Sequence, residues 1–176
     1  CQADLPTIAS LWLALKAAGG AEVVICSTCY GGSSELTDLV GDGGGPLRKT
    51  TFDLQGGLSF NDSIRETLEA LAAAPRAGAL PATVVFVEIP SNPDQKLPDL
   101  AALARDVGAY QAATGARTLV LVDTTFAPAS GVLGKLAAHA PGLEAMTFVS
   151  MSKSVSRGLT TAGALVANHT AGSREL

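Results

Sequence analysis

The chain has 176 residues, of which 47% are hydrophobic, a length and composition suited to one domain with a sizeable core. Its formal net charge is −4, and no cluster of Lys or Arg marks a surface for nucleic acid, so nucleic-acid binding is not expected. No apolar run reaches the roughly 18 residues that a membrane-spanning helix needs, so no membrane partner is expected either.

Apolar periodicity predicts helices that alternate with buried strands along the whole chain. The first helix is expected to open at Asp4, a suitable N-cap, and to stop at Gly19 and Gly20. Later helices are expected at residues 33–40, after a cap at Asn61 or Ser63, from Pro98 onward, and at residues 132–138. The expected strands cover residues 22–26, 48–53, 83–89, 118–123, 145–150 and 162–168.

This alternation predicts an α/β fold, with a mostly parallel sheet and helices on both of its faces. Residues 1–176 are expected to form a single domain. The chain begins with Cys1 rather than Met and ends without a clear stop signal. We therefore expect the chain to be cut at both ends, so that any targeting signal would be missing from it.

Polar side chains follow two of the expected strands, and open α/β sheets bind ligands where their strands end. Asp123 ends one strand, and Ser150, Ser152 and Lys153 follow another. A desolvated lysine can form a Schiff base with a carbonyl, the two serines could bind a phosphate, and Asp123 could keep a ring nitrogen protonated. Pyridoxal 5'-phosphate needs such a set. An open alternative is that Lys153 reaches solvent and Asp123 caps a turn.

Four segments, taken together, resemble the pyridoxal-phosphate enzymes of cysteine and methionine metabolism. This family includes cystathionine γ-synthase, the cystathionine lyases and methionine γ-lyase. The segments resemble its motifs Tyr-Gly-x-Thr, Glu-x-Pro-x-Asn-Pro, Val-Asp-Asn-Thr-Phe and Ser-x-Thr-Lys. They are Tyr30-Gly31-Gly32-Ser33, Glu88-Ile89-Pro90-Ser91-Asn92-Pro93, Val122-Asp123-Thr124-Thr125-Phe126 and Ser150-Met151-Ser152-Lys153.

The resemblance implies a large domain of fold type I, like that of aspartate aminotransferase, that binds pyridoxal 5'-phosphate. Lys153 would hold the cofactor as a Schiff base and shuttle the α-proton. Asp123 would contact the pyridine nitrogen, Tyr30 would stack on the ring and assist elimination, and Asn92 would face the phenolic oxygen. The substrate would be cysteine, homocysteine, cystathionine or methionine, and the enzyme a homodimer or homotetramer.

The phosphate would be bound by Ser150 and Ser152. The family's own phosphate loop would fall near Asp4, where a carboxylate at a helix N-terminus repels a phosphate. Thr124 stands in place of the family's asparagine, and residues 154–163 depart from its glycine-rich, aromatic stretch. Neither the N-terminal segment nor the C-terminal domain with its substrate-binding arginine is expected in this chain.

These departures leave two other functions open. The first is a degenerate or truncated homologue that serves as a scaffold or interaction module without a cofactor. The second is an unrelated nucleotide-binding domain, although the glycines of residues 41–45 follow a helix rather than a strand.

Cys26 and Cys29 have the spacing of a redox motif, but packing is the favoured interpretation because no thioredoxin-like context surrounds them. The sequence offers no second cysteine pair or histidine cluster for zinc. Three cysteines are too few for a disulfide scaffold, which favours a reducing, cytoplasmic location.

Overall fold

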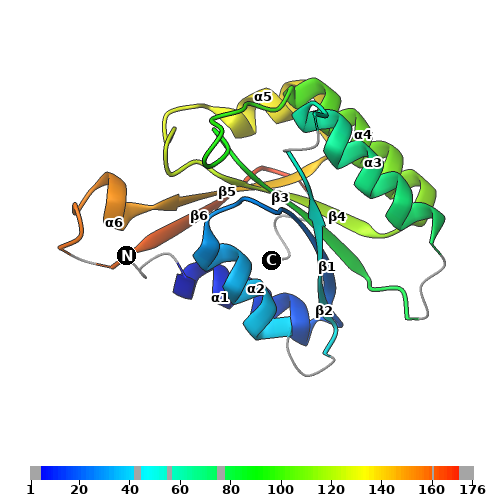
Figure 1. The fold of residues 1–176 in the computed structure, drawn as a ribbon, viewed down its shortest axis with the longest axis horizontal. Coiled ribbons are helices and arrows are strands. Elements are labelled where there is room, and N and C mark those ends of the chain that lie inside the picture. Colours follow the sequence, from blue (N-terminus) through cyan, green and yellow to red (C-terminus); the bar gives the residue numbers. More distant parts are fainter. Residues whose placement is uncertain (1–4, 42–44, 55–56, 75–77, 160, 171–176) are drawn as a thin grey trace.

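Six strands form one sheet in the order β2-β1-β3-β4-β5-β6 (Figure 1). The computed structural model describes residues 5–41, 45–54, 57–74, 78–159 and 161–170. The first five strands pair in parallel and β6 pairs antiparallel with β5, which confirms the mostly parallel sheet. The strands are β1 (Ala21–Cys26), β2 (Leu47–Phe52), β3 (Ala82–Glu88), β4 (Arg117–Asp123), β5 (Glu144–Ser150) and β6 (Gly163–Ala167).

Helices cover both faces of the sheet, as expected (Figure 1). Two helices lie on one face, α1 (Leu5–Ala17) and α2 (Gly31–Gly41). Three lie on the other, α3 (Phe60–Ala73), α4 (Leu100–Thr114) and α5 (Val132–His139). The single-turn helix α6 (Met151–Ser154), which follows β5, was not expected from the sequence.

The core lies between the sheet and its two helical layers. The β-branched and aromatic side chains of β3 are fully buried from Val84 to Val87, because a parallel strand covered on both faces has no solvent side. On α1, Ile8 and Trp12 are also fully buried. Trp12 Nε1 donates a hydrogen bond to Thr37 Oγ1 at 3.1 Å, which ties α1 to α2.

The cap of α3 differs from the expectation of Asn61 or Ser63. Ser59 is the N-cap, and its Oγ accepts a hydrogen bond from Asp62 N at 3.1 Å. Asn61 instead bridges to α4: its side chain accepts from Asp99 N at 2.8 Å and donates to Asp99 O at 2.9 Å. A tertiary partner therefore takes the side chain that the local pattern assigned to the cap.

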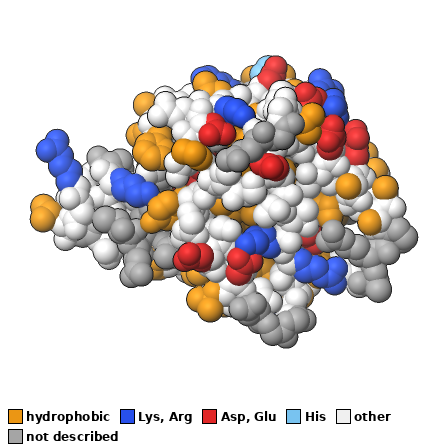
Figure 2. All heavy atoms as spheres, viewed as in Figure 1, with side chains coloured by type: hydrophobic (Ala, Val, Ile, Leu, Met, Phe, Trp, Pro, Cys, Tyr) orange, Lys and Arg blue, Asp and Glu red, His pale blue; other side chains and the backbone are white. Residues whose placement is uncertain are grey.

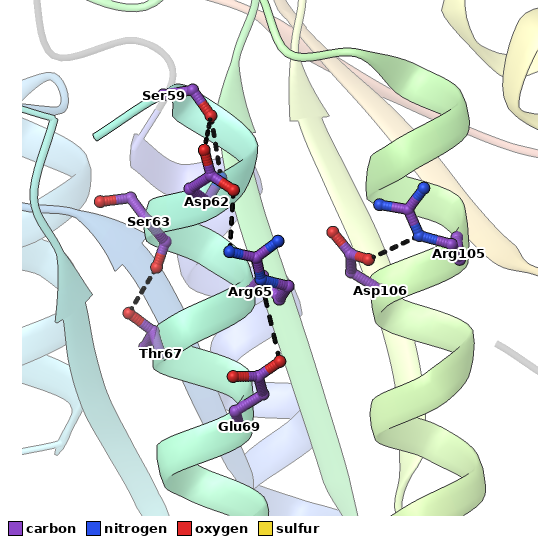
Figure 3. A network of polar contacts seen from close by, with 8 residues as sticks. All are labelled: Ser59, Asp62, Ser63, Arg65, Thr67, Glu69, Arg105 and Asp106. Atoms are coloured by element: carbon purple, nitrogen blue, oxygen red, sulfur yellow. Dashed lines mark hydrogen bonds and ion pairs between the residues drawn. The ribbon is translucent and has the colours of Figure 1, made fainter.

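Helices α3 and α4 carry short-range ion pairs, drawn in Figure 3. Arg65 lies 2.8 Å from Asp62 and 3.8 Å from Glu69 on α3, and Arg105 lies 3.0 Å from Asp106 on α4. The two pairs of Arg65 are exposed, and exposed pairs each stabilise a fold by at most about 1 kcal/mol. They mark the solvent side of α3, whereas Asp106 is buried and pairs with an exposed Arg105.

Acidic and basic side chains are interspersed on the face seen in Figure 2, where no large basic patch gathers. None of the described helices is long and apolar enough to cross a membrane. Within the same residues, no group of three or more His, Cys, Asp or Glu side chains could hold a metal ion.

The order in which strands are added to the sheet reverses between β1 and β3, two parallel neighbours: β2 lies on the outer side of β1, and β3 and β4 follow on the other side. After β1 the chain enters α2 on one face, and after β3 it enters α4 on the other (Figure 1). Loops that leave neighbouring strand ends in opposite directions open a crevice between them, where α/β sheets bind ligands.

Candidate functional site

A cavity of about 190 Å³ lies at this carboxyl edge of the sheet. Loops after four different strands contribute to it, so residues far apart in the sequence meet there. It brings together four of the six residues that the sequence singled out. The described residues that line it are Tyr30, Glu88, Asn92, Asp123, Thr125, Phe126 and Lys153.

Strand register places two carboxylates at neighbouring strand ends. Glu88 and Asp123 are direct partners in the parallel pairing of β3 with β4. Asp123 Oδ1 accepts a hydrogen bond from Thr125 N at 2.8 Å, so this side chain does cap a turn. It also lines the cavity, so the capping role and a binding role are compatible.

Lys153 and Tyr30 face each other across the cavity. The Nζ of Lys153 lies 4.3 Å from the centroid of the Tyr30 ring, within the range of a cation–π contact. Tyr30 comes directly before α2, and Lys153 lies in α6. The Lys153 side chain is exposed in this structure, whereas its place after a buried strand suggested a desolvated amine.

Glu88 is buried, with 7% of its surface exposed, and both of its oxygens are used. Oε1 accepts a hydrogen bond from Tyr30 N at 2.7 Å, and Oε2 accepts one from Asn92 N at 3.2 Å. Burial raises the pKa of the Glu88 carboxyl, and the charge of Asp123 raises it further. The two N–H donors and Lys153 act in the opposite direction on the same pKa.

Ser150 and Ser152 do not line the cavity with the other four residues. Both are buried. Ser152 Oγ accepts a hydrogen bond from Ala162 N at 3.0 Å and donates one to Ala162 O at 3.3 Å, and Ser150 N donates to Thr125 Oγ1 at 3.0 Å. These contacts hold the loops around α6 together.

The cysteines lie beside the site rather than in it. Cys26 and Cys29 are buried free thiols. Burial raises the pKa of Cys29 from 9.0 to about 12, and the charge of Glu88 adds to the effect. Because the thiolate is the reactive form of cysteine, this environment does not favour redox chemistry.

Three of the lining residues received no role from the sequence: Glu88, Thr125 and Phe126. Glu88 ends a run of four buried apolar residues, and a carboxylate in that place was a signal for a paired, functional group. Phe126 is 69% exposed although it belongs to a strand-end motif. Thr125 gave no such signal.

A larger cavity of about 480 Å³ lies at the opposite, amino edge of the sheet. Its polar groups are already engaged, since Thr83 and Tyr110 are hydrogen-bonded at 3.1 Å and Arg48 donates to Gly78 O at 3.0 Å. Size alone therefore does not identify the reactive site. The carboxyl-edge cavity combines an amine, a carboxylate, an amide and an aromatic ring.

Each of these groups has a chemical use toward one kind of ligand. An amine can add to a carbonyl, a carboxylate can bind a protonated ring nitrogen, and an aromatic ring can stack on a planar ligand. The cavity thus suits a flat heterocycle that carries a reactive carbonyl.

The chain shares its fold, fold type I, with solved structures of enzymes that contain pyridoxal phosphate. The chain matches no protein-family profile and no curated protein sequence. The expectation of this fold from the four motifs is confirmed.

Three of these structures illustrate the likeness. Cystathionine γ-lyase from Micromonospora echinospora is 24% identical, with a TM-score of 0.62 over 94% of this chain and 36% of the enzyme. Cystathionine γ-lyase from yeast is 19% identical, with a TM-score of 0.66 over 94% and 36%. The aromatic-amino-acid aminotransferase from Burkholderia pseudomallei, covalently bound to pyridoxal phosphate, is 18% identical, with a TM-score of 0.63 over 94% and 40%. The chain thus spans less than half of the length of each of these proteins.

Proposed function

We propose that this chain is the cofactor-binding large domain of a pyridoxal-phosphate-dependent lyase or transferase that acts on sulfur amino acids. One observation carries the proposal. The Lys153 amine, the Tyr30 ring and the Asp123 carboxylate line a single cavity at the carboxyl edge of a fold-type-I sheet. The four sequence motifs that contain these residues support the same cofactor.

The lining residues fit the ring of pyridoxal phosphate and its aldehyde. Lys153 offers an amine, Asp123 a carboxylate and Asn92 an amide on the same cavity. Its volume of about 190 Å³ is smaller than the roughly 300–1,000 Å³ of most ligand pockets, so the described residues enclose a part of the complete site. Phosphate binding by Ser150 and Ser152 stays a prediction.

Pyridoxal phosphate, when bound, supplies an electron sink that stabilises a carbanion at the substrate's α-carbon. Lys153 would hold the cofactor through Nζ and, once displaced by the substrate amine, would move the α-proton. Asp123 would keep the ring nitrogen protonated through charge pairing. Tyr30, whose ring already lies against Lys153 Nζ, would stack on the cofactor and assist departure of the substituent.

The proposed reaction is elimination or replacement at the sulfur-bearing side chain of cysteine, homocysteine, cystathionine or methionine. The resemblance of the four motifs to the cystathionine and methionine enzymes supports this choice. Two of the solved structures described above are cystathionine γ-lyases, whereas the third is an aminotransferase. The fold is therefore compatible with several reactions, and the motifs favour the sulfur amino acids.

Titration with pyridoxal phosphate tests the cofactor directly. We expect an absorption band near about 420 nm, typical of an imine between the cofactor and a lysine. Lys153→Ala should abolish the band. Lys135→Ala, which removes an exposed lysine on α5 that does not line the cavity, should leave the band unchanged. An undiminished band in the Lys153→Ala variant would contradict the proposal.

A scaffold without a cofactor is the second candidate. The exposed Lys153 and the small cavity favour it, because a bound cofactor needs more enclosure than these residues supply. Equilibrium dialysis separates the two candidates. Micromolar or tighter retention of pyridoxal phosphate by the chain excludes the scaffold, and no retention supports it.

We also propose that the chain works in a homodimer or homotetramer in the cytoplasm. Exposed apolar side chains support assembly, since Phe126, which lines the cavity, is 69% exposed and Leu159, five residues after α6, is 90% exposed. Hydrophobic side chains also reach the surface at the α6 end of the molecule in Figure 2. The free thiols of Cys26 and Cys29 are compatible with a reducing compartment.

A further inference from the structure

Glu88 occupies a central place in the cavity for which the proposed chemistry gives no task. It ends β3 between Tyr30, which follows β1, and Asn92, which lies in the loop after β3. Its two oxygens accept hydrogen bonds from the backbone N–H groups of these two residues, at 2.7 Å and 3.2 Å. One side chain thus joins the loop after β1 to the loop after β3, which leave the sheet toward opposite faces.

Burying the Glu88 carboxylate costs free energy unless its hydrogen bonds compensate for the loss of water. Only 7% of the surface of Glu88 is exposed, and removing a carboxylate from water costs several kcal/mol unless it is paired. Two N–H donors offset this cost, since hydrogen bonds to a charged acceptor are about twice as strong as neutral ones. The geometry needs two acceptor oxygens that diverge, which a carboxylate supplies.

We propose that Glu88 is a positioning residue, which fixes the Tyr30 and Asn92 loops relative to each other and so holds the Tyr30 ring and the Asn92 side chain in place along the cavity. The effect of Glu88 on cofactor affinity rests on the proposed function, whereas its hydrogen bonds to the two loops are independent of that function. These two consequences are measured separately.

Glu88→Gln is the informative change because it keeps the size of the side chain. The amide oxygen of glutamine can accept from one N–H, but its NH₂ group faces the other N–H as a donor. One loop should therefore lose its anchor. Glu22→Gln is the matched control, since Glu22 is also a buried glutamate on a strand, but it lies near the start of β1, where it accepts from Thr50 Oγ1 at the amino edge of the sheet.

Backbone amide NMR reads the hold on the loops without any cofactor. In Glu88→Gln, the amide proton of Tyr30 or of Asn92 should move upfield and exchange faster with solvent, while Glu22→Gln leaves both signals in place. The dissociation constant of pyridoxal phosphate should then rise about tenfold in Glu88→Gln and stay within about twofold of wild type in Glu22→Gln.

Unchanged Tyr30 and Asn92 amides in Glu88→Gln would overturn the proposal, as would equal changes in both variants or an unchanged dissociation constant. If the wild-type chain binds no pyridoxal phosphate, the proposed function fails and the amide signals still decide the role of Glu88. If Glu88→Gln does not fold, wild-type hydrogen exchange decides it. Slow exchange at both amides supports the proposal, and exchange as fast as in an exposed loop refutes it.

Discussion

The carboxylate of Asp123 serves the turn after β4 through one oxygen, which accepts from Thr125 N, and it lines the cavity as well. Asp123→Asn keeps the size of the side chain and the acceptor for this turn but removes the charge. We expect pyridoxal phosphate to bind about tenfold more weakly, because a neutral amide does not hold the ring nitrogen protonated. Spectroscopic titration measures the change.

Asp53→Asn is the control for this prediction. Asp53 follows β2 at the same edge of the sheet, and its Oδ1 accepts from Ser27 Oγ at 3.3 Å outside the cavity. The dissociation constant of pyridoxal phosphate in Asp53→Asn should match that of the wild type. Equal weakening by both changes would show that Asp123 acts through the general charge of this edge and has no specific contact with the cofactor.

Cys29 gives the fold a defined alkaline sensitivity. Its pKa rises from 9.0 to about 12 in the folded state, so the folded chain holds a proton that the unfolded chain releases in this range. The unfolding free energy should therefore fall as the pH rises from 9.0 to about 12, by at most about 1.4 kcal/mol per unit. Below pH 9.0 this contribution is fully present.

Urea denaturation at several alkaline pH values measures this loss. Cys29→Ala should flatten the slope relative to wild type. Cys26→Ala, which removes the neighbouring buried thiol, is the control for the lost packing. A slope that stays the same in Cys29→Ala would show that other groups cause the alkaline loss.

The sequence anticipated the site where a motif fixed both the residue type and its strand end. Tyr30, Asn92, Asp123 and Lys153 line one cavity for this reason. The contacts of Ser152 were not predictable, because a hydroxyl after a strand can turn to the site or to the backbone, and here Ala162 takes it. The exposure of Lys153 depends on α6, which the sequence did not reveal.

At the scale of elements, the cap of α3 is a local feature with a measurable effect. Ser59 Oγ accepts from Asp62 N, and loss of an N-cap acceptor typically costs about 1 kcal/mol. Ser59→Ala should lower the unfolding free energy by this amount in urea denaturation. Ser10→Ala, on the exposed side of α1, should change it by less than about 0.5 kcal/mol. Equal effects would contradict the cap.

The strands were predicted to within about one residue at each end, because short continuous apolar runs such as Val84 to Val87 are typical of parallel strands that are buried on both faces. Helix starts were less predictable. Asn and Ser are about equally favoured as N-caps, and the contact of Asn61 with Asp99, the N-cap of α4, decides in favour of Ser59. The four-residue helix α6 is too short to show a period.

At the scale of the whole molecule, the chain corresponds to about two fifths of the enzymes that share its fold. Exposed apolar side chains that follow α6 are expected to be covered by a second copy of the chain. Leu159 is 90% exposed and Val155 is 67% exposed. Sedimentation should show a dimer or tetramer, and a Val155→Ser, Leu159→Ser double variant should be monomeric.

Leu39→Ser is the control for assembly, because Leu39 is 71% exposed on α2 and lies away from α6. It should leave the sedimentation coefficient unchanged. A monomeric wild-type chain, or a double variant that assembles like wild type, would contradict this mode of assembly.

Covalent labelling of the lysines tests the central claim most directly. Borohydride reduction of the chain with about one equivalent of pyridoxal phosphate makes an imine bond permanent, and peptide mapping then finds the labelled lysine. We expect a label on Lys153, which lies 4.3 Å from the Tyr30 ring, and a weaker label in Tyr30→Ala or Asp123→Asn at the same low concentration. A label spread over the surface lysines, or concentrated at a lysine other than Lys153, would contradict it.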